Sequence, residues 1–172
     1  SNEQRQVRIL RPEEAEPFFP ETDLWILYQP DRTFDPVYTF LNSNQVPVMT
    51  LTGKLTDWNY LNEVQLSFRI QEAGPLEELL PESNPAFGYF DISEWEVSNY
   101  PPLEGFLGEY YIREPHEWLL GQRVRGVPLL QPLVALIKGS RRREAVVFGT
   151  GIWKWRMSAY SRQGDFTEFD AT

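Results

Sequence analysis

The residues best placed to do chemistry form a glycine-threonine-glycine turn near the end of the chain. Four apolar residues, 145–148, precede this turn, and a segment with helical spacing follows it. This order predicts a strand, a tight turn and a helix, and the unbonded backbone amides at the start of such a helix can bind an anion or another polar ligand. The candidate ligand-binding residues are therefore Gly149, Thr150, Gly151, Trp153 and Arg156.

Arg156 is the most unusual of these residues, because it falls in the middle of the apolar arc of the predicted helix. Ile152, Trp153 and Tyr160 lie on the same arc. A guanidinium buried there without a partner would cost several kcal/mol. We therefore expect Arg156 to bind a carboxylate, backbone carbonyl groups or a ligand.

The turn does not match the known phosphate-binding loops. Lys154 stands where the dinucleotide fingerprint has its third glycine, and no Walker lysine-serine or lysine-threonine pair is present. The alternative to a small-anion site is a tight packing turn that lets Trp153 and Arg156 dock under the neighbouring strands. We expect neither a cofactor nor a bound metal.

Side chains suited to catalysis are few. The sequence contains no cysteine, and no Gly-x-Ser-x-Gly motif supplies another nucleophile. The sole histidine, His116, lies in a polar segment between two predicted strands, where we expect it to be exposed. The carboxylate pairs Glu77 with Glu78 and Asp31 with Asp35 are expected on the surface of an acidic protein. We therefore expect no catalytic residue.

The composition fits one domain with a substantial core. The chain has 172 residues, of which 41% are hydrophobic and 15% aromatic. Its net charge of −9 argues against nucleic acid or an anionic membrane surface as the partner. The one dense basic run, residues 141–143, is expected to be the solvated tip of a hairpin. No apolar run reaches the ~20 residues that are needed to span a bilayer.

The first half of the chain alternates strand and helix patterns. Thr33 is expected to cap a first helix and Asp57 a second, shorter one. The strand that precedes the first helix is apolar enough to be buried on both faces of a sheet. Strands are predicted at residues 7–10, 23–28, 46–51 and 66–70.

The second half predicts antiparallel strands at short spacing. Residues 75–85 are typical of a proline-bearing loop, and the strands that follow are predicted at residues 86–90, 109–112, 118–120, 133–137 and 145–148. The expected fold class is therefore α/β: a partly parallel, Rossmann- or flavodoxin-like sheet flanked by helices and extended by an antiparallel β-meander. The meander returns to the sheet just before Gly149.

The beginning of the chain resembles the remnant of a removed tag. Ser1 and Asn2 stand there in place of an initiating methionine. Residues 1–2 are then an expression scar, and residues 3–172 are expected to form a single domain excised from a larger protein.

Four segments together carry a family resemblance: residues 23–30, 46–53, 100–103 and 149–156. Their order resembles the glutamine-amidotransferase-like domain near the C-terminus of large membrane-anchored bacterial proteins that also carry a von Willebrand factor A-like region. The similarity covers roughly residues 20–170. It implies a class I amidotransferase-like or ThuA-like α/β fold, although the cysteine and histidine of a working glutaminase are not found in that arrangement here.

The resemblance also implies a cellular setting. The parent protein would be anchored in the bacterial cell envelope, with this domain on the periplasmic side rather than in the cytoplasm. The expected function is a non-catalytic interaction or assembly domain whose partners are other domains of the parent or envelope proteins, and not nucleic acid. The alternatives are a small-ligand sensor that uses residues 149–156, and a hydrolase or transferase of unknown type. The oligomeric state stays open.

Overall fold

The computed structural model describes residues 6–71 and 73–163. In this part of the chain, seven strands form one curled, mixed sheet in the order β1-β2-β9-β8-β7-β4-β5, and two more form a separate ribbon, β3-β6. The strands are β1 (Trp25–Tyr28), β2 (Val48–Leu51), β3 (Phe68–Gln71), β4 (Leu76–Ser83), β5 (Leu103–Phe106), β6 (Glu109–Ile112), β7 (His116–Val124), β8 (Val127–Lys138) and β9 (Arg143–Val147). The α-helices are α1 (Asp35–Ser43), α2 (Trp58–Val64) and α3 (Trp153–Gln163), and the 3-10 helices are η1 (Pro12–Glu14), η2 (Glu16–Glu21), η3 (Arg32–Phe34) and η4 (Val97–Asn99).

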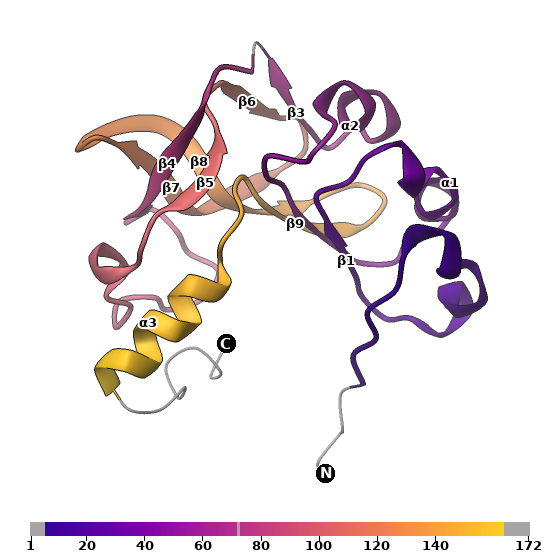
Figure 1. Cartoon of the computed structure of the whole chain (residues 1–172), viewed down its shortest axis with the longest axis horizontal. Coiled ribbons are helices and arrows are strands. Elements are labelled where there is room, and N and C mark those ends of the chain that lie inside the picture. Colours follow the sequence, from indigo (N-terminus) through magenta and orange to yellow (C-terminus); the bar gives the residue numbers. More distant parts are fainter. Residues whose placement is uncertain (1–5, 72, 164–172) are drawn as a thin grey trace.

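The parallel part of the sheet confirms the expected alternation of strand and helix. β1 pairs in parallel with β2, and β2 with β9. Asp57 caps α2 as predicted, since its Oδ1 accepts the N–H of Tyr60 at 3.0 Å. Thr33 does not cap α1, because the η3 turn intervenes and Asp31 caps that turn instead. Figure 1 shows α1 and α2 on one side of these strands and α3 on the other.

β4 corrects the prediction that residues 75–85 are a proline-bearing loop. Residues 76–79 of β4 pair with β5, whereas residues 80–83 pair with β7. Pro81 therefore lies where β4 is bonded along one edge only, and a strand tolerates proline there because the missing N–H is not needed on the other edge.

The sheet curls until its last strand meets the end of β9. The N–H of Thr150 donates to the carbonyl oxygen of Glu104 on β5 at 2.8 Å, and the N–H of Glu104 returns the bond at 2.9 Å. The predicted meander is otherwise confirmed, because β7, β8 and β9 are antiparallel neighbours. β6 leaves the meander to pair with β3.

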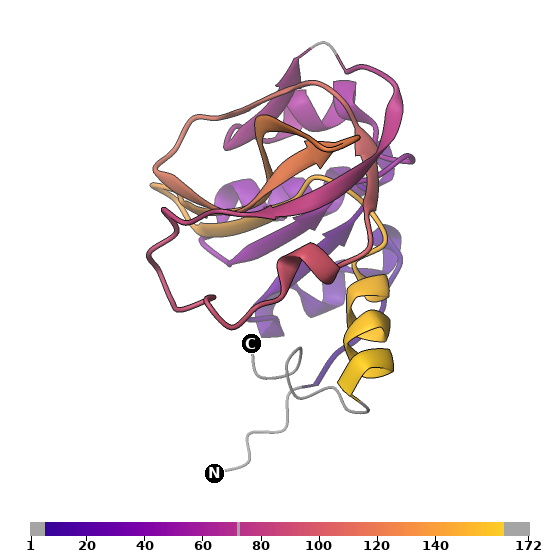
Figure 2. The same cartoon turned by 90° about the vertical axis from the view of Figure 1, so that its left-hand side faces the viewer.

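Two apolar cores lie on opposite faces of the sheet. The first packs α1 and α2 against residues such as Leu27 and Val146, and the second packs residues 95–103 and Trp155 of α3 against Val134 and Val147. Figure 2 shows that the long segment between β4 and β5, with η4, lies beside α3. No residue of β1 belongs to the second core, so the face of β1 that points away from α1 and α2 stays uncovered.

Three predicted strand features differ from the structure. Residues 7–10 and 86–90 are not strands. β1 is buried on one face only, because Ile26 and Tyr28 point outward from the edge strand of the sheet and stay more than half exposed. The apolar run at residues 23–28 therefore predicted the strand β1 correctly. It could not predict whether one or both faces of β1 are buried, because that depends on which other elements pack against them.

A bulge in β8 offers a test of the backbone geometry. Leu130 has a φ of 53° and is 82% exposed, and the left-handed conformation costs a non-glycine residue about 1–2 kcal/mol. We expect Leu130→Gly to raise the free energy of unfolding by about 0.5–1 kcal/mol in urea titrations, after the entropy cost of glycine. Val127→Gly, in the extended part of the same strand, should lower it.

Candidate functional site

The predicted turn lies at the carboxyl ends of the three parallel strands, where open α/β sheets bind their ligands. Residues 149–151 follow β9, Gln29 follows β1, and residues 52–53 follow β2. The structure therefore brings the ends of three chain segments together at the carboxyl ends of the parallel strands, and Gly149, Thr150 and Gly151 follow a strand as the sequence predicted.

Side chains from these three segments bind each other. The Tyr28 hydroxyl lies 3.0 Å from Oγ1 of Thr150, and the Thr52 hydroxyl donates to the carbonyl oxygen of Val147 at 3.1 Å. Oε1 of Gln29 accepts the N–H of Leu55 at 2.8 Å. Gly53 lies close to the turn, because an added Cβ would lie 2.9 Å from Cβ of Thr150 and 2.6 Å from Oε1 of Gln29. These contacts join the segments that follow β1, β2 and β9 at the carboxyl ends of the strands.

Strand β5 occupies the other side of the turn. The N–H of Thr150 is already bonded to Glu104, so it is not available to an anion. An added Cβ on Gly149 would lie 2.9 Å from Cβ of Leu103, and Gly151 has a φ of 104°. Gly149 therefore lets β5 approach closely, and Gly151 adopts a left-handed backbone conformation. Both roles fit a tight packing turn. None of residues 149–156 lines either of the two cavities found in residues 6–71 and 73–163.

The structure contradicts the predicted environment of Arg156. Its side chain is exposed, and so are Trp153 and Tyr160, which were expected to screen it from water. Trp155 is the side chain of α3 that points into the core, and its ring stacks on Tyr100 with the centroids 5.2 Å apart. Nε1 of Trp155 also donates to the carbonyl oxygen of Pro101 at 2.7 Å. Trp153 and Arg156 therefore do not dock under the strands.

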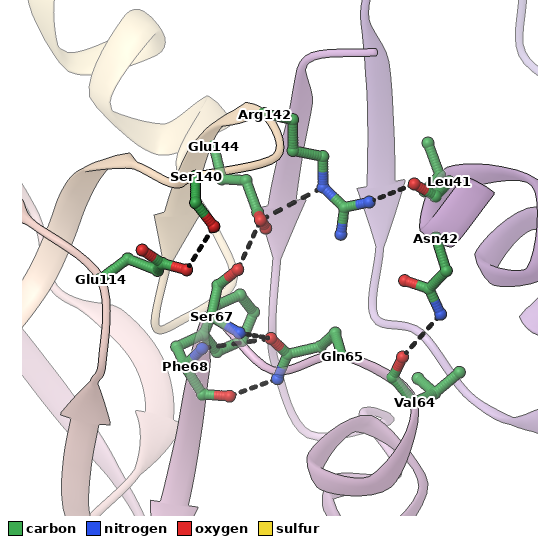
Figure 3. Close-up of polar contacts among 10 residues, drawn as sticks. All are labelled: Leu41, Asn42, Val64, Gln65, Ser67, Phe68, Glu114, Ser140, Arg142 and Glu144. Carbon is green, nitrogen blue, oxygen red and sulfur yellow. Dashed lines mark hydrogen bonds and ion pairs between the residues drawn. The ribbon is translucent and has the colours of Figure 1, made fainter. Parts of the chain in front are cut away.

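A buried ion pair lies at the amino ends of the parallel strands, opposite the turn (Figure 3). Nε of Arg142 lies 3.2 Å from Oε1 of Glu144, and both side chains are almost fully buried. The Arg142 guanidinium also donates to the carbonyl oxygen of Leu41 at 2.6 Å, and the Ser67 hydroxyl donates to Oε1 of Glu144 at 2.5 Å. Arg142 and Glu144 thereby join β9 to the end of α1 and to the segment before β3.

Neighbouring groups complete this cluster. Oε1 of Gln65 accepts the N–H groups of Ser67 and Phe68 at 3.0 and 3.1 Å. Burial raises the pKa of the Tyr38 hydroxyl above its usual range, and nearby Tyr60 and Glu144 add to that rise. Tyr38 therefore stays neutral beside the ion pair.

Arg142 was predicted in the solvated tip of the β8–β9 hairpin, and that prediction is wrong for this residue alone. Arg141 and Arg143 are exposed as expected. Side chains two residues apart share a face of a strand, so the spacing of Arg142 and Glu144 places both on the helix-covered face. A basic and an acidic residue at this spacing, next to an apolar strand, were the signal that could have revealed the pair.

Three of the remaining candidates for chemistry have structural partners. Nδ1 of His116 lies 2.8 Å from the carbonyl oxygen of Glu114. Glu77 forms an ion pair with Arg125 at 2.8 Å, and Asp31 accepts from the backbone and hydroxyl of Thr33. Within residues 6–71 and 73–163, no group of three histidine or acidic side chains is placed to hold a metal ion. None of the α-helices in that part of the chain is long and apolar enough to cross a membrane.

Comparisons of the chain with models of protein families, with curated proteins and with solved structures find no match.

Proposed function

We propose that this chain is a non-catalytic interaction domain that binds a protein partner through apolar surfaces on β1 and α3. The observation that carries the proposal is the exposure of five large side chains on these two elements. Their exposed fractions are 54% for Ile26, 57% for Tyr28, 65% for Trp153, 52% for Met157 and 44% for Tyr160.

The two surfaces belong to one region of the molecule. The bond between Tyr28 and Thr150 ties the end of β1 to the turn that begins α3. On α3, the spacing of Trp153, Met157 and Tyr160 follows the helical repeat, so the three side chains share a face opposite buried Trp155. Extended apolar patches of this kind are typical of interaction sites, and tryptophan and tyrosine are enriched among the residues that dominate binding.

Contacts within the chain support the non-catalytic part of the proposal, because they already occupy the turn and the histidine that were considered for ligand binding or catalysis. The turn at residues 149–151 is bonded to β5, and His116 contacts a backbone carbonyl. The family resemblance supports a partner among other domains of a membrane-anchored envelope protein, or among its neighbours in the envelope. It also supports a class I amidotransferase-like ancestry for the α/β fold, which here would serve as a scaffold.

A ligand-binding sensor is the second candidate, favoured by Gln29. This buried residue has a φ of 49° at the carboxyl end of β1. Non-glycine residues in the left-handed region are strained, and such strain gathers at functional sites. We rank the sensor second because Oε1 of Gln29 already binds the backbone of Leu55, and the described cavities lie elsewhere.

Site-specific photo-crosslinking in cells tests the interaction domain. We expect a crosslinking residue at Ile26, and one at Met157, to form an adduct with the same protein. A second change, Trp153→Glu, should weaken the adduct at Ile26 by about tenfold or more, equivalent to ~1.4 kcal/mol of binding. Thermal unfolding should stay unchanged, because Trp153 is exposed.

Val127 is the matched control for this experiment. Its side chain is 59% exposed, a fraction similar to that of Ile26, but Val127 is the first residue of β8 and does not belong to β1 or α3. Equal adducts at Val127 and Ile26 would indicate random collisions and contradict the proposal. Different partners at Ile26 and Met157 would contradict a shared binding region.

A further inference from the structure

A groove of about 530 Å³ opens on the outer face of the sheet, at the end of β9 opposite the predicted turn. Its floor is apolar, because Met49, Ala145 and Leu136 stand side by side on β2, β9 and β8 in the strand register. The volume lies within the roughly 300–1,000 Å³ that small-molecule sites occupy. The groove is thus large enough for an apolar chain.

Two cations lie next to each other at one end of this groove. Lys138 on β8 and Arg143 on β9 are directly opposite in the antiparallel register, an arrangement in which like charges destabilise a sheet. None of the ion pairs among the described residues includes either side chain. In a chain with a net charge of −9, this local concentration of positive charge favours an anionic ligand.

Polar groups in and beside the groove have partners of their own. The ammonium group of Lys138 lies 4.1 Å from the ring centroid of Tyr89, which holds the cation over the groove. Glu144 also lines the groove, but its carboxylate is paired with Arg142. Glu117, which is opposite Leu136 in the register, accepts the N–H of Gly88 at 2.8 Å. These carboxylates therefore have other partners than Lys138 and Arg143.

We propose that this groove binds a medium-chain fatty acid. The carboxylate would lie between Lys138 and Arg143, where the planar guanidinium can bond both carboxylate oxygens. The alkyl chain would lie along the floor, beside Met49 and Leu136. This ligand site goes beyond the proposed interaction function, because none of its residues belongs to the apolar surfaces on β1 and α3.

Methionine methyl NMR can test this site with an internal control. The chain has two methionines, Met49 in the floor of the groove and Met157 on α3. We expect titration with decanoate to shift the Met49 signal saturably and to leave the Met157 signal in place. Met157→Leu assigns the two signals. Acetate, the head group alone, and decyltrimethylammonium, the same chain with a cationic head, should shift neither signal.

Variants of the two cations complete the test. Arg143→Gln and Lys138→Gln should each weaken decanoate binding by at least about tenfold. Arg141→Gln should not, since Arg141 is exposed in the same hairpin but does not line the groove. No saturation below about 1 mM decanoate, or equal binding of decyltrimethylammonium, would overturn the proposal. So would a Met49 shift with an acidic amphipathic peptide and not with decanoate.

Discussion

Replacing Arg142 with methionine is expected to lower the free energy of unfolding by about 3–5 kcal/mol, because it leaves the Glu144 carboxylate buried without its charge partner. The guanidinium bond to the carbonyl oxygen of Leu41 would be lost as well. Arg141→Met and Arg143→Met should change the stability by no more than about 0.5 kcal/mol, since both side chains are exposed. Urea titrations monitored by circular dichroism would measure all three variants.

A double variant separates the charge effect from the loss of packing. Removing both charges in Arg142→Met with Glu144→Met should recover most of the stability, because apolar replacement of a whole buried ion pair is often neutral or stabilising. If Arg142→Met were as stable as Arg141→Met, the buried pair would not contribute to the fold. If the double variant were less stable than the single one, the contacts of Glu144 with Ser67 would outweigh those with Arg142.

The parallel half of the fold could be predicted because its signals are local. The apolar runs at β1 and β2 and the cap at Asp57 each act within a few residues, and the structure has each of them where expected. Helical spacing likewise indicated α3. Such signals say which element forms, and they say less about what it packs against.

The features that the sequence did not predict depend on distant partners. β4 forms despite Pro81 because β5 and β7 bond different halves of the strand. In the segment that forms α3, apolar residues surround most of the helix, so either Trp153 or Trp155 could have faced inward. Tyr100 and Pro101 decide in favour of Trp155, which leaves Arg156 exposed. Periodicity could not weigh these partners, because none of them lies in the helix.

Gly105→Ala is expected to lower the free energy of unfolding by about 2–3 kcal/mol, as overpacking of a core does. A Cβ at this position would lie 2.6 Å from the carbonyl oxygen of Phe148 and 2.7 Å from Cδ1 of Leu79. The first of these atoms belongs to the backbone, so β5 would have to move away from the turn. Gly121→Ala is the matched control, since its Cβ would meet nothing closer than 3.7 Å. Calorimetric unfolding of both variants would measure the difference.

The stability of Gly105→Ala also bears on which function the turn serves. Gly105 lets β5 approach Phe148, and the neighbouring Glu104 then occupies the backbone N–H of Thr150. A variant as stable as Gly121→Ala would mean that β5 is not pressed against the turn in solution. The Thr150 amide would then be open to a ligand, and the sensor would replace the interaction domain as the better proposal. A large loss of stability would instead mean that the turn is a closed part of the fold, which leaves the exposed side chains of β1 and α3 as the binding region.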